Sequence, residues 1–388
     1  MRAAHEAHDY CTDVSETTPY PTFSDAEYAR RDAAARALMD RETLDCLLIY
    51  GSGRNADVYW LSGWPGTREA YLLYPRKGAP ALRVQLRNHL PNAKGMSRFA
   101  DVDWAGRDSG ETILALLRER AAKRIGIVGG LAWTHYETLR RGLADVSFID
   151  LSAATRLLRA TRSAEEIERF RIAARLTDRA MRALEREAKP GLREEELAAI
   201  VEASYAREGG THGIHFLATT PMRDPAIGVP SQIQSRRVLE KGDVLITEIS
   251  AEYWGYSGQI HRAYAIGAEP TPEYRKLHDV AVEAYERVRE VIRDGAAAAD
   301  VLDAAAVIER RGYTIYDDLL HGAGQLPPIL RVRPAPDFTF RENMVVVIQP
   351  NVVANGARMG LQLGETVRVT CDGTERLHDY PMRFVICR

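Results

Sequence analysis

Apolar and polar positions follow two different periods along this chain, and the periods separate its expected elements. Ser24 and Glu27 form a capping-box signal at the start of an amphipathic helix that runs to about Asp40. Short apolar runs predict strands at 45–50, 70–74, 81–85, 124–128 and 146–150, and helical patterns predict helices at 111–124 and 134–142. Strands that alternate with helices predict an α/β first domain.

The pattern changes after a boundary near 151–161. Ser163 and Glu166 form a second capping box, and from there an order of helix, glycine, helix, glycine and strand pair occurs twice. The expected helices are 164–187, 193–207, 272–293 and 297–311, and the strand pairs are 241–262 and 344–349 with 360–370. This duplication predicts a curved antiparallel sheet backed by four helices, with a cleft between the halves. The expected divisions are an arm at 1–23, a first domain at 24–158 and a second at 159–388.

Composition describes an ordinary globular protein and narrows its partners. The 388 residues are 45% hydrophobic and 27% charged. A net charge of −2 argues against nucleic acid or an anionic membrane as the main partner, and no apolar run reaches the ~18 residues of a membrane span. The first residues lack the apolar segment of a secretory signal, and the four cysteines form no Cys-x-x-Cys pair, which favours a reduced, cytoplasmic protein.

The first hairpin of the second domain carries the first candidate site. If its turn is centred between Tyr253 and Trp254, Glu248 lies directly across from Gln259, with Cβ atoms about 5 Å apart. His261 follows on the same face as Gln259. A carboxylate, an amide and an imidazole that converge in a mostly apolar hairpin indicate a functional site, because buried ionisable groups are costly unless paired. A strand with one satisfied buried Glu is the alternative.

Several spaced motifs resemble those of one known family. Segment 159–167 resembles its linker, Lys241-Gly-Asp243 with Gly255, Tyr256 and Arg262 its first hairpin, His321-Gly-Ala-Gly324 its His-Gly-x-Gly loop, and Gln349-Pro350 with 366–373 its last two strands. This is the pita-bread family of creatinase, aminopeptidase P and prolidase. The resemblance implies an α+β chain, in which an α/β creatinase-type N-terminal domain precedes a pita-bread catalytic domain.

The resemblance also implies where metal ions would bind. The peptidases of this family hold two divalent metals with Asp, Asp, His, Glu and Glu, and the matching positions are Glu248, Gln259, His321, Gln349 and Gly364. Two divalent ions need several carboxylates for charge balance, and one remains here. Glu365, next to Gly364, should point to the opposite face of its strand. The expectation is therefore no metal and no cofactor, as in the creatinase branch of the family.

Creatine is nevertheless not the expected substrate. Creatinase uses a His that is matched here by Ser231, and two glutamates that clamp its guanidinium substrate are matched by His261 and Gln349. A guanidinium clamp needs anions, and these groups are neutral. His321 is expected in a flexible glycine-rich loop, where ligand-facing residues are common.

These residues together predict a metal-independent hydrolase that cleaves a C–N bond, such as an amide, in a small polar substrate. His261 or His321 would activate water, Glu248 would orient the His or share its proton, and Gln259 and Gln349 would bind the oxyanion. The alternatives are a residual Xaa-Pro dipeptidase with one metal at Glu248 and His321, a metal-free lyase, and a non-catalytic small-molecule-binding protein.

Five further positions are tied to the expected cleft or its wall. Tyr256 and Ser231 are candidate substrate contacts, although a hydroxyl in a turn is the ordinary interpretation of Ser231. Arg262 is expected to pair with a carboxylate. His212 and His215 lie close together in sequence, but no carboxylate is spaced to complete a metal site with them.

An anionic substrate would need a cation. In creatinase a neighbouring subunit sends an Arg from a first-domain loop into the site, and Arg68 is the matching residue, so the resemblance implies a homodimer. Arg331 or Arg333 is a second candidate for this role. A solvated surface Arg is the alternative at each position.

Overall fold

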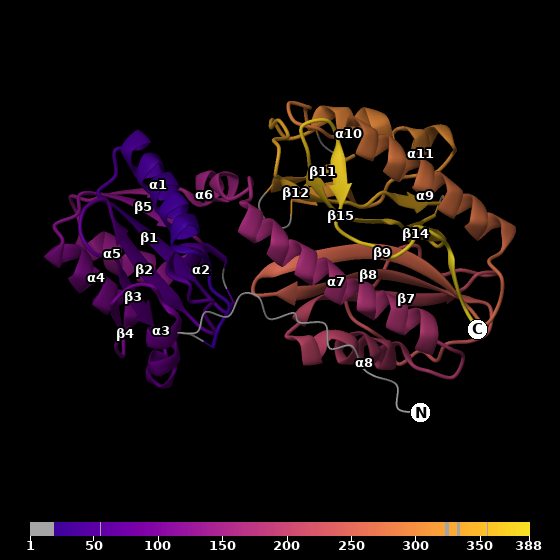
Figure 1. The fold of residues 1–388 in the computed structure, drawn as a ribbon, viewed down its shortest axis with the longest axis horizontal. Helices are drawn as coiled ribbons and strands as arrows, with labels where there is room; N and C mark the ends of the chain where they lie inside the picture. Colours follow the sequence, from indigo (N-terminus) through magenta and orange to yellow (C-terminus); the bar gives the residue numbers. More distant parts are fainter. Residues whose placement is uncertain (1–18, 55, 323–325, 332–333, 355) are drawn as a thin grey trace. The chain divides into compact units, whose positions relative to one another are not determined.

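The computed structural model describes residues 19–54, 56–322, 326–331, 334–354 and 356–388. The chain divides into two compact units, Met1–Leu158 and Arg159–Arg388 (Figure 1). Most of the expected arm, 1–18, lies outside the described residues. Each unit has its own sheet and its own hydrophobic core.

The sheet of the first unit has the strand order β4-β3-β2-β1-β5-β6. Its strands are β1 (Cys46–Gly51), β2 (Ala70–Pro75), β3 (Ala81–Val84), β4 (Asp101–Trp104), β5 (Arg124–Val128) and β6 (Ser147–Asp150). Strand β1 is antiparallel to β2 and parallel to β5. Leu47 and Leu48, adjacent in β1, belong to different hydrophobic clusters, so both faces of the sheet are covered.

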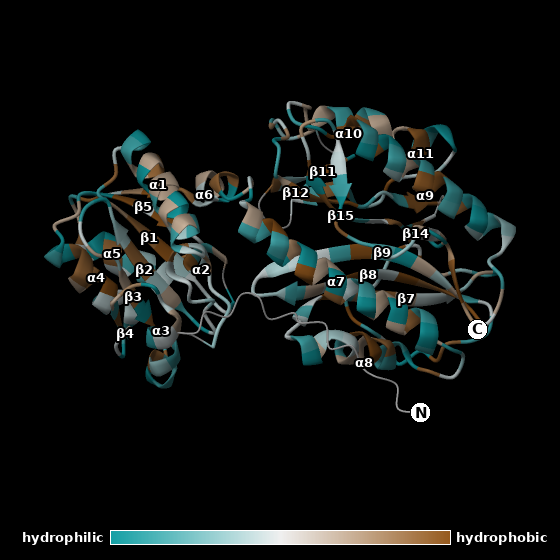
Figure 2. Ribbon diagram, viewed as in Figure 1, coloured by the Kyte–Doolittle hydropathy of each residue, from teal (hydrophilic) through white to brown (hydrophobic). Residues whose placement is uncertain are grey.

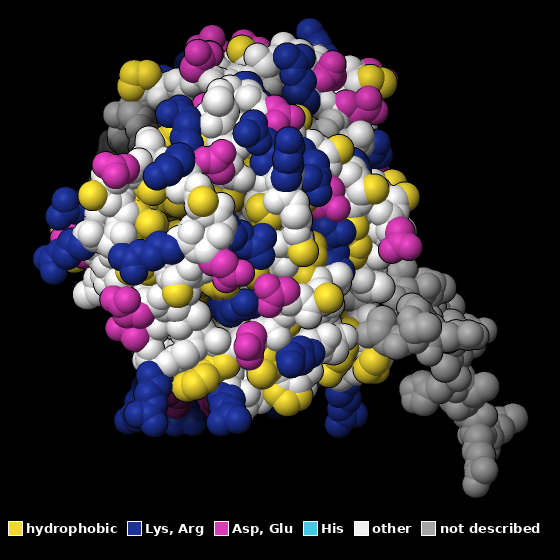
Figure 3. All heavy atoms as spheres, turned by 90° about the vertical axis from the view of Figure 1, so that its left-hand side faces the viewer, with side chains coloured by type: hydrophobic (Ala, Val, Ile, Leu, Met, Phe, Trp, Pro, Cys, Tyr) yellow, Lys and Arg dark blue, Asp and Glu magenta, His cyan; other side chains and the backbone are white. Residues whose placement is uncertain are grey.

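Helices α1 to α6 cover this sheet. They are α1 (Asp25–Arg41), α2 (Ala56–Ser62), α3 (Leu90–Met96) after the short 3₁₀ helix η1 (Arg87–His89), α4 (Ser109–Glu119), α5 (Trp133–Gly142) and α6 (Ser152–Leu158). The Ser24 Oγ accepts a hydrogen bond from the Glu27 N–H at 3.1 Å, so α1 begins where the sequence predicts. The face of the molecule drawn in Figure 3 carries basic and acidic side chains interspersed with apolar ones.

The main sheet of the second unit has the order β11-β10-β12-β15-β9-β8-β7. Its strands are β7 (Thr211–Pro221), β8 (Asp243–Tyr253), β9 (Tyr256–Ile266), β10 (Asp318–Gly322), β11 (Leu326–Leu330), β12 (Val345–Ile348) and β15 (Gly364–Val369). Strands β16 (Thr374–Arg376) and β17 (Val385–Cys387) pair with β15 and β9, and β13 (Asn351–Val353) pairs with β14 (Gly360–Gln362).

Helices pack on both faces of this sheet (Figure 1). They are α7 (Ala164–Glu187), α8 (Glu194–Tyr205) with the 3₁₀ turn η2 (Ala206–Glu208), α9 (Pro272–Val291), α10 (Ala299–Ala305) and α11 (Val307–Arg310). Leu245 and Ile249 of β8 pack with residues of α7 and α8, whereas Val244 and Ile246 pack with residues of α9. Figure 2 shows hydrophilic and hydrophobic residues along α7 and α9, as expected of helices with one buried face.

Helix α7 fixes the position of the β8–β9 hairpin. Its start is the predicted capping box, with Ser163 and Glu166 each binding the other's backbone N–H. The Thr177 hydroxyl donates to the Gly258 carbonyl at 2.6 Å. A Cβ on Gly258 would lie 2.4 Å from the Ala174 nitrogen, so only glycine lets β9 approach the helix this closely.

Three expectations about this unit were wrong in detail. The turn of the hairpin is Trp254-Gly255, so Glu248 lies across from His261 and not from Gln259. The helix expected at 297–311 is broken into α10 and α11. His321 lies in strand β10 and not in a flexible loop, while 323–325 of the expected glycine-rich loop lie outside the described residues. No described helix has both the length and the apolar character that crossing a bilayer requires.

Candidate functional site

Six polar side chains from four strands come together in the second unit, and we call them the polar cluster. They are Glu248 from β8, Gln259 and His261 from β9, Asp318 and His321 from β10, and Gln349 directly after β12. Glu248, Gln259, His261 and Gln349 are buried, whereas Asp318 and His321 are partly exposed. The cluster therefore reaches solvent at its β10 end.

The Gln259 side chain links the members of the cluster. Its Nε2 lies 2.9 Å from Glu248 Oε1, 3.0 Å from Gln349 Oε1 and 3.1 Å from His261 Nε2. The backbone of Gln259 is held by Thr366, whose Oγ1 accepts from the Gln259 N–H and donates to its carbonyl. An amide nitrogen has two N–H groups, so Gln259 cannot donate to all three neighbours at once.

The carboxyl groups of the cluster are electrostatically unfavourable as anions. Burial raises the pKa of Glu248 to about 8, and the charges of Asp317 and Asp318 add to the rise. Burial likewise raises the pKa of Asp318 to about 6, with Asp317 adding to it and the Gln349 N–H opposing it. Burial is the larger cause of both shifts, so it favours the protonated, neutral form of each carboxyl group.

Both imidazoles of the cluster are held neutral. Burial lowers the pKa of His261 well below its usual value, and the charges of His321 and Arg262 act in the same direction. Burial also lowers the pKa of His321, opposed by a hydrogen bond with Gln349 and by the charge of Asp317. A neutral imidazole can accept a proton, and the role of His261 or His321 as the base stays a prediction.

Asp318 was missed by sequence reasoning, and Asn351 explains how it reaches the cluster. The Asn351 Oδ1 accepts from the backbone N–H groups of Tyr316 and Asp317, and its Nδ2 donates to the Asp318 carbonyl at 3.2 Å. The Asp318 side chain then accepts a hydrogen bond from Gln349 Nε2. Asp318 stands three residues before His321, and that spacing is a signal only once β10 is recognised as a strand.

The structure places two predicted substrate contacts away from the polar cluster. Tyr256 lies on the other face of β9, where its hydroxyl donates to Glu166 at 3.1 Å and its ring packs against Phe170 of α7. Arg331 is exposed and forms an ion pair with Glu309 of α11, because its strand ends at the surface. Neither side chain lies in the polar cluster, and a role of Tyr256 or Arg331 in substrate binding stays a prediction.

The other weaker candidates are not drawn into the cluster. The Ser231 hydroxyl donates to the Ile233 carbonyl at 2.8 Å, which is the ordinary turn interpretation. Arg68 is an exposed residue of the first unit, and its role in a homodimer stays a prediction. Arg333 lies outside the described residues.

Arg262 and Glu365 form a structural pair beside the cluster. The two side chains are fully buried, and Arg262 Nη2 lies 2.6 Å from Glu365 Oε2. Glu365 thus faces away from Gln259 and His261, as strand alternation predicts, and Arg262 pairs with a carboxylate as expected.

At Gly364, the last of the five family positions, the backbone leaves no room for a side chain. Gly364 lies opposite His261 in the ladder between β15 and β9. A Cβ at this position would lie 1.9 Å from the Ile348 carbonyl oxygen and 2.8 Å from Gln349 Cα. Backbone atoms therefore occupy the space that a side chain would need, so this position offers no ligand without movement of β12.

Substituting Gly364 tests this closure. Gly364→Ala is expected to lower the free energy of unfolding by about 1–3 kcal/mol, because the new Cβ overpacks against backbone. The matched control is Gly373→Ala, where a Cβ meets nothing within 4 Å and little change is expected. Urea unfolding measures the free energy of unfolding of both variants. A Gly364→Ala protein as stable as wild type would show that β12 moves aside at little energetic cost.

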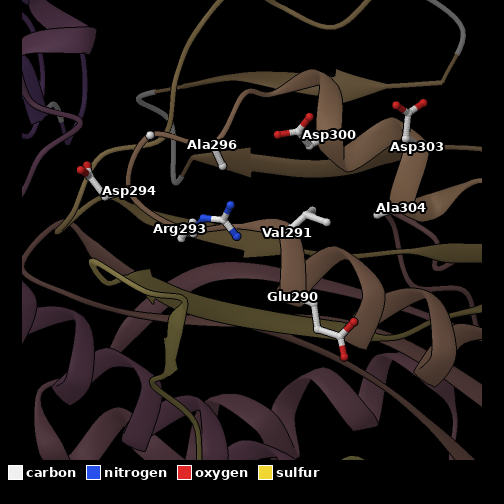
Figure 4. Close-up of a pocket in the computed structure, with 9 residues that line it drawn as sticks. Glu290, Val291, Arg293, Asp294, Ala296, Asp300, Asp303 and Ala304 are labelled. Atoms are coloured by element: carbon white, nitrogen blue, oxygen red, sulfur yellow. The ribbon is translucent and has the colours of Figure 1, made fainter.

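A separate surface hollow lies between the end of α9 and α10. Its volume is about 530 Å³, and Figure 4 shows Glu290 and Val291 on α9 and Asp300 and Asp303 on α10. All nine of its lining residues fall in 290–304, outside the polar cluster. We therefore assign the candidate active site to the cluster.

The side chains of the polar cluster do not supply the ligands of a two-ion site, and no three of its carboxylate and imidazole ligand atoms lie close enough together in this structure to hold one ion without movement. Gln259 and Gln349 are neutral amides, and Gly364 has no side chain. Carboxylates from Glu248 and Asp318 and an imidazole from His321 remain. The buried Nδ1 of His261 has no hydrogen-bond partner among the described residues, so it is a further nitrogen that could act as a metal ligand.

Comparisons with known proteins agree with this fold. Residues 168–371 match the model of metallopeptidase family M24, and residues 31–161 match the creatinase/prolidase N-terminal domain. An Xaa-Pro dipeptidase of Pyrococcus horikoshii is 26% identical over 87% of this chain and 94% of its own length. The structure of an X-Pro aminopeptidase from Thermotoga maritima has a TM-score of 0.80 at 22% identity, covering 92% of this chain and 99% of the other. The prolidase of Pyrococcus horikoshii has a TM-score of 0.79 at 23% identity, covering the same shares.

These matches contradict the predicted metal-independent, creatinase-like hydrolase. The family model is one of metallopeptidases, and the similar curated proteins are named Xaa-Pro dipeptidases. The prediction went wrong because it counted carboxylates only at the five family positions. Asp318 comes from outside that set, so the loss of negative charge from the site is smaller than the sequence indicated.

Proposed function

Because the chain belongs to metallopeptidase family M24, we propose that it is an Xaa-Pro dipeptidase-type peptidase with a reduced, single-ion metal site. The observation that carries the proposal is the match over 168–371, within which Glu248 and His321 keep ligand-capable side chains at two of the five family positions. A dipeptide with proline in second place is the substrate class suggested by the relatives' names.

Glu248 and His321 would hold the ion, and Asp318 would join them after a side-chain movement, because the three ligand atoms are not grouped around one point in this structure. This set of two carboxylates and one imidazole suits divalent ions such as Zn²⁺ or Mn²⁺. A bound divalent ion lowers the pKa of a water molecule and polarises a substrate carbonyl.

The other members of the polar cluster act on protons and orientation. Burial keeps His261 neutral, so it can take a proton from water or pass one to the leaving nitrogen. Gln259 holds the Glu248 carboxyl in place through its 2.9 Å hydrogen bond. The Gln349 side chain accepts a hydrogen bond from Gln259 and donates one to the Asp318 carboxylate, so it links the β10 side of the cluster to β9.

Chelation and metal replacement test this proposal. Purified protein treated with a chelator should lose hydrolysis of a panel of Xaa-Pro dipeptides, and added Mn²⁺, Co²⁺ or Zn²⁺ should restore it. Elemental analysis should find about one metal equivalent in His212→Ala, a variant that lacks the separate group of possible ligands at Glu202, His212 and His215. That equivalent should disappear in His212→Ala/Glu248→Gln.

Two results would contradict the proposal. Xaa-Pro hydrolysis that a chelator leaves unchanged would exclude the metal requirement. A metal-loaded protein that cleaves no member of the dipeptide panel would exclude the substrate class. The dipeptides with proline replaced by alanine serve as the substrate control.

A further inference from the structure

A second set of metal-binding side chains lies on the opposite face of the sheet from the polar cluster. Glu202 of α8 and His212 and His215 of β7 bring one carboxylate oxygen and two imidazole nitrogens together. His215 pairs with Ile249 of β8, and Ile249 packs under α7 and α8, whereas Glu248 faces the polar cluster. The two groups therefore lie on different faces of β8 and do not share a pocket.

The three donor atoms already have the spacing of ligands around one ion. His212 Nδ1 lies 3.1 Å from His215 Nδ1 and 3.1 Å from Glu202 Oε1, and His215 Nδ1 lies 3.5 Å from the same oxygen. Donors about 2.0–2.1 Å from a tetrahedral Zn²⁺ are roughly 3.3 Å from one another. Among the described residues, Glu202, His212 and His215 are the one group of three or more His, Cys, Asp or Glu side chains whose ligand atoms lie this close together.

A bulge in β7 creates this arrangement. In a regular strand, residues 212 and 215 would point to opposite faces, because they are three positions apart. The register of β7 against β8 shifts between His212 and Ile214, so Gly213 is an extra residue and both imidazoles turn to the α8 side. A Cβ on Gly213 would lie 2.8 Å from the Ser250 carbonyl oxygen, so the bulge packs closely against β8.

The protonation states also suit a metal ion. The His215 Nε2 lies 2.8 Å from the Tyr205 hydroxyl, and an Nε2–H that donates to this oxygen leaves Nδ1 as a free lone pair. Glu202 and His212 are exposed, which leaves room for water as a fourth ligand.

We propose that Glu202, His212 and His215 form a second metal site, one that binds Zn²⁺ and ties the end of α8 to the start of β7. The ion is held by one carboxylate and two imidazoles, with Tyr205 as the outer partner that orients His215. The proposal does not rest on the proposed peptidase activity, because the site lies on the other face of the sheet. A simple hydrogen-bonded network of the same four side chains is the competing arrangement.

Zinc binding in a background without the polar-cluster ligand tests this site. The full-length His321→Ala protein, freed of metal with a chelator, should take up about one Zn²⁺ equivalent on equilibrium dialysis. Adding His212→Ala or Glu202→Gln should weaken that binding by more than about 100-fold, since loss of an outer partner alone costs 10–100-fold. Tyr205→Phe should fall in that 10–100-fold range.

Thermal unfolding supplies the second measurement. Zn²⁺ should raise the unfolding midpoint of His321→Ala by a few degrees and should leave that of the His212→Ala double variant unchanged. Glu195→Gln, an exposed carboxylate on the same helix, is the matched control and should bind Zn²⁺ normally. Equal Zn²⁺ affinity in His321→Ala, its His212→Ala and its Glu202→Gln derivatives would overturn the site and leave the hydrogen-bonded network.

Discussion

Replacing His321 with alanine should lower the turnover of an Xaa-Pro dipeptide by roughly 10²–10⁴-fold. In the proposed site the neutral imidazole of His321 would be either a ligand of the ion or an acceptor of a proton, since its one free lone pair can serve one of these functions at a time. It is also partly exposed on β10, so its removal leaves a small cavity at the edge of the core and should not unfold the protein.

The control for this experiment is His212→Ala. His212 is an exposed histidine of the same unit on the other face of the sheet, and its removal should leave dipeptide turnover unchanged. Steady-state kinetics give kcat and KM for both variants, and urea unfolding checks their folds. If His321→Ala turned over dipeptides at the wild-type rate, His321 would have neither role.

Replacing Arg262 with methionine should lower the free energy of unfolding by about 3–5 kcal/mol. The guanidinium group is fully buried, and its loss leaves Glu365 as a buried carboxylate with one cationic partner, Arg376, where it had two. The change also removes the donors that bind the carbonyls of His261, Gly364, Tyr380 and Pro381. Each buried carbonyl left without a partner adds to the cost.

An exposed ion pair provides the comparison. Arg287 and Glu283 form a 2.9 Å pair on the surface of α9, and Arg287→Met should change stability by less than about 1 kcal/mol. Denaturant titrations of the two variants measure the difference directly. A loss of under 1 kcal/mol in Arg262→Met would mean that water or a rearranged Arg376 replaces the guanidinium group.

Much of the fold could be predicted because its signals are local. The box at Ser163 and Glu166, the glycines that follow the helices and the alternation in β8 and β9 all lie within a few residues of the elements they specify. The spaced motifs indicated the family, and the pita-bread assignment made from them is confirmed by the matches over both units.

The turn of the main hairpin shows where local signals fail. Both central residues, Trp254 and Gly255, have positive φ angles of 49° and 81°. Glycine adopts such angles freely, but a bulky residue rarely does, so a turn centred one residue earlier looked equally good from sequence. The true register pairs Glu248 with His261, yet Gln259 still reaches Glu248 diagonally.

The candidate site was predicted where strands were recognised and missed where they were not. Glu248, Gln259 and His261 follow from alternation in one hairpin, and His321 and Gln349 were added by the resemblance. Asp318 depends on β10, a short strand with an irregular register that no periodic pattern marks. Glu202 meets His212 and His215 only through the bulge at Gly213, which is a feature of strand pairing and not of sequence spacing.

The closure of position 364 also limits how this protein could change by mutation. A carboxylate restored at 364 alone would collide with the end of β12, and carboxylates restored at 259 or 349 alone would add buried negative charge beside Glu248 and Asp318. Each single step is therefore destabilising, while the combined changes could be compensated by a second ion. The effects of these substitutions therefore depend on one another, and the stability change of the combined variant would differ from the sum of the single changes.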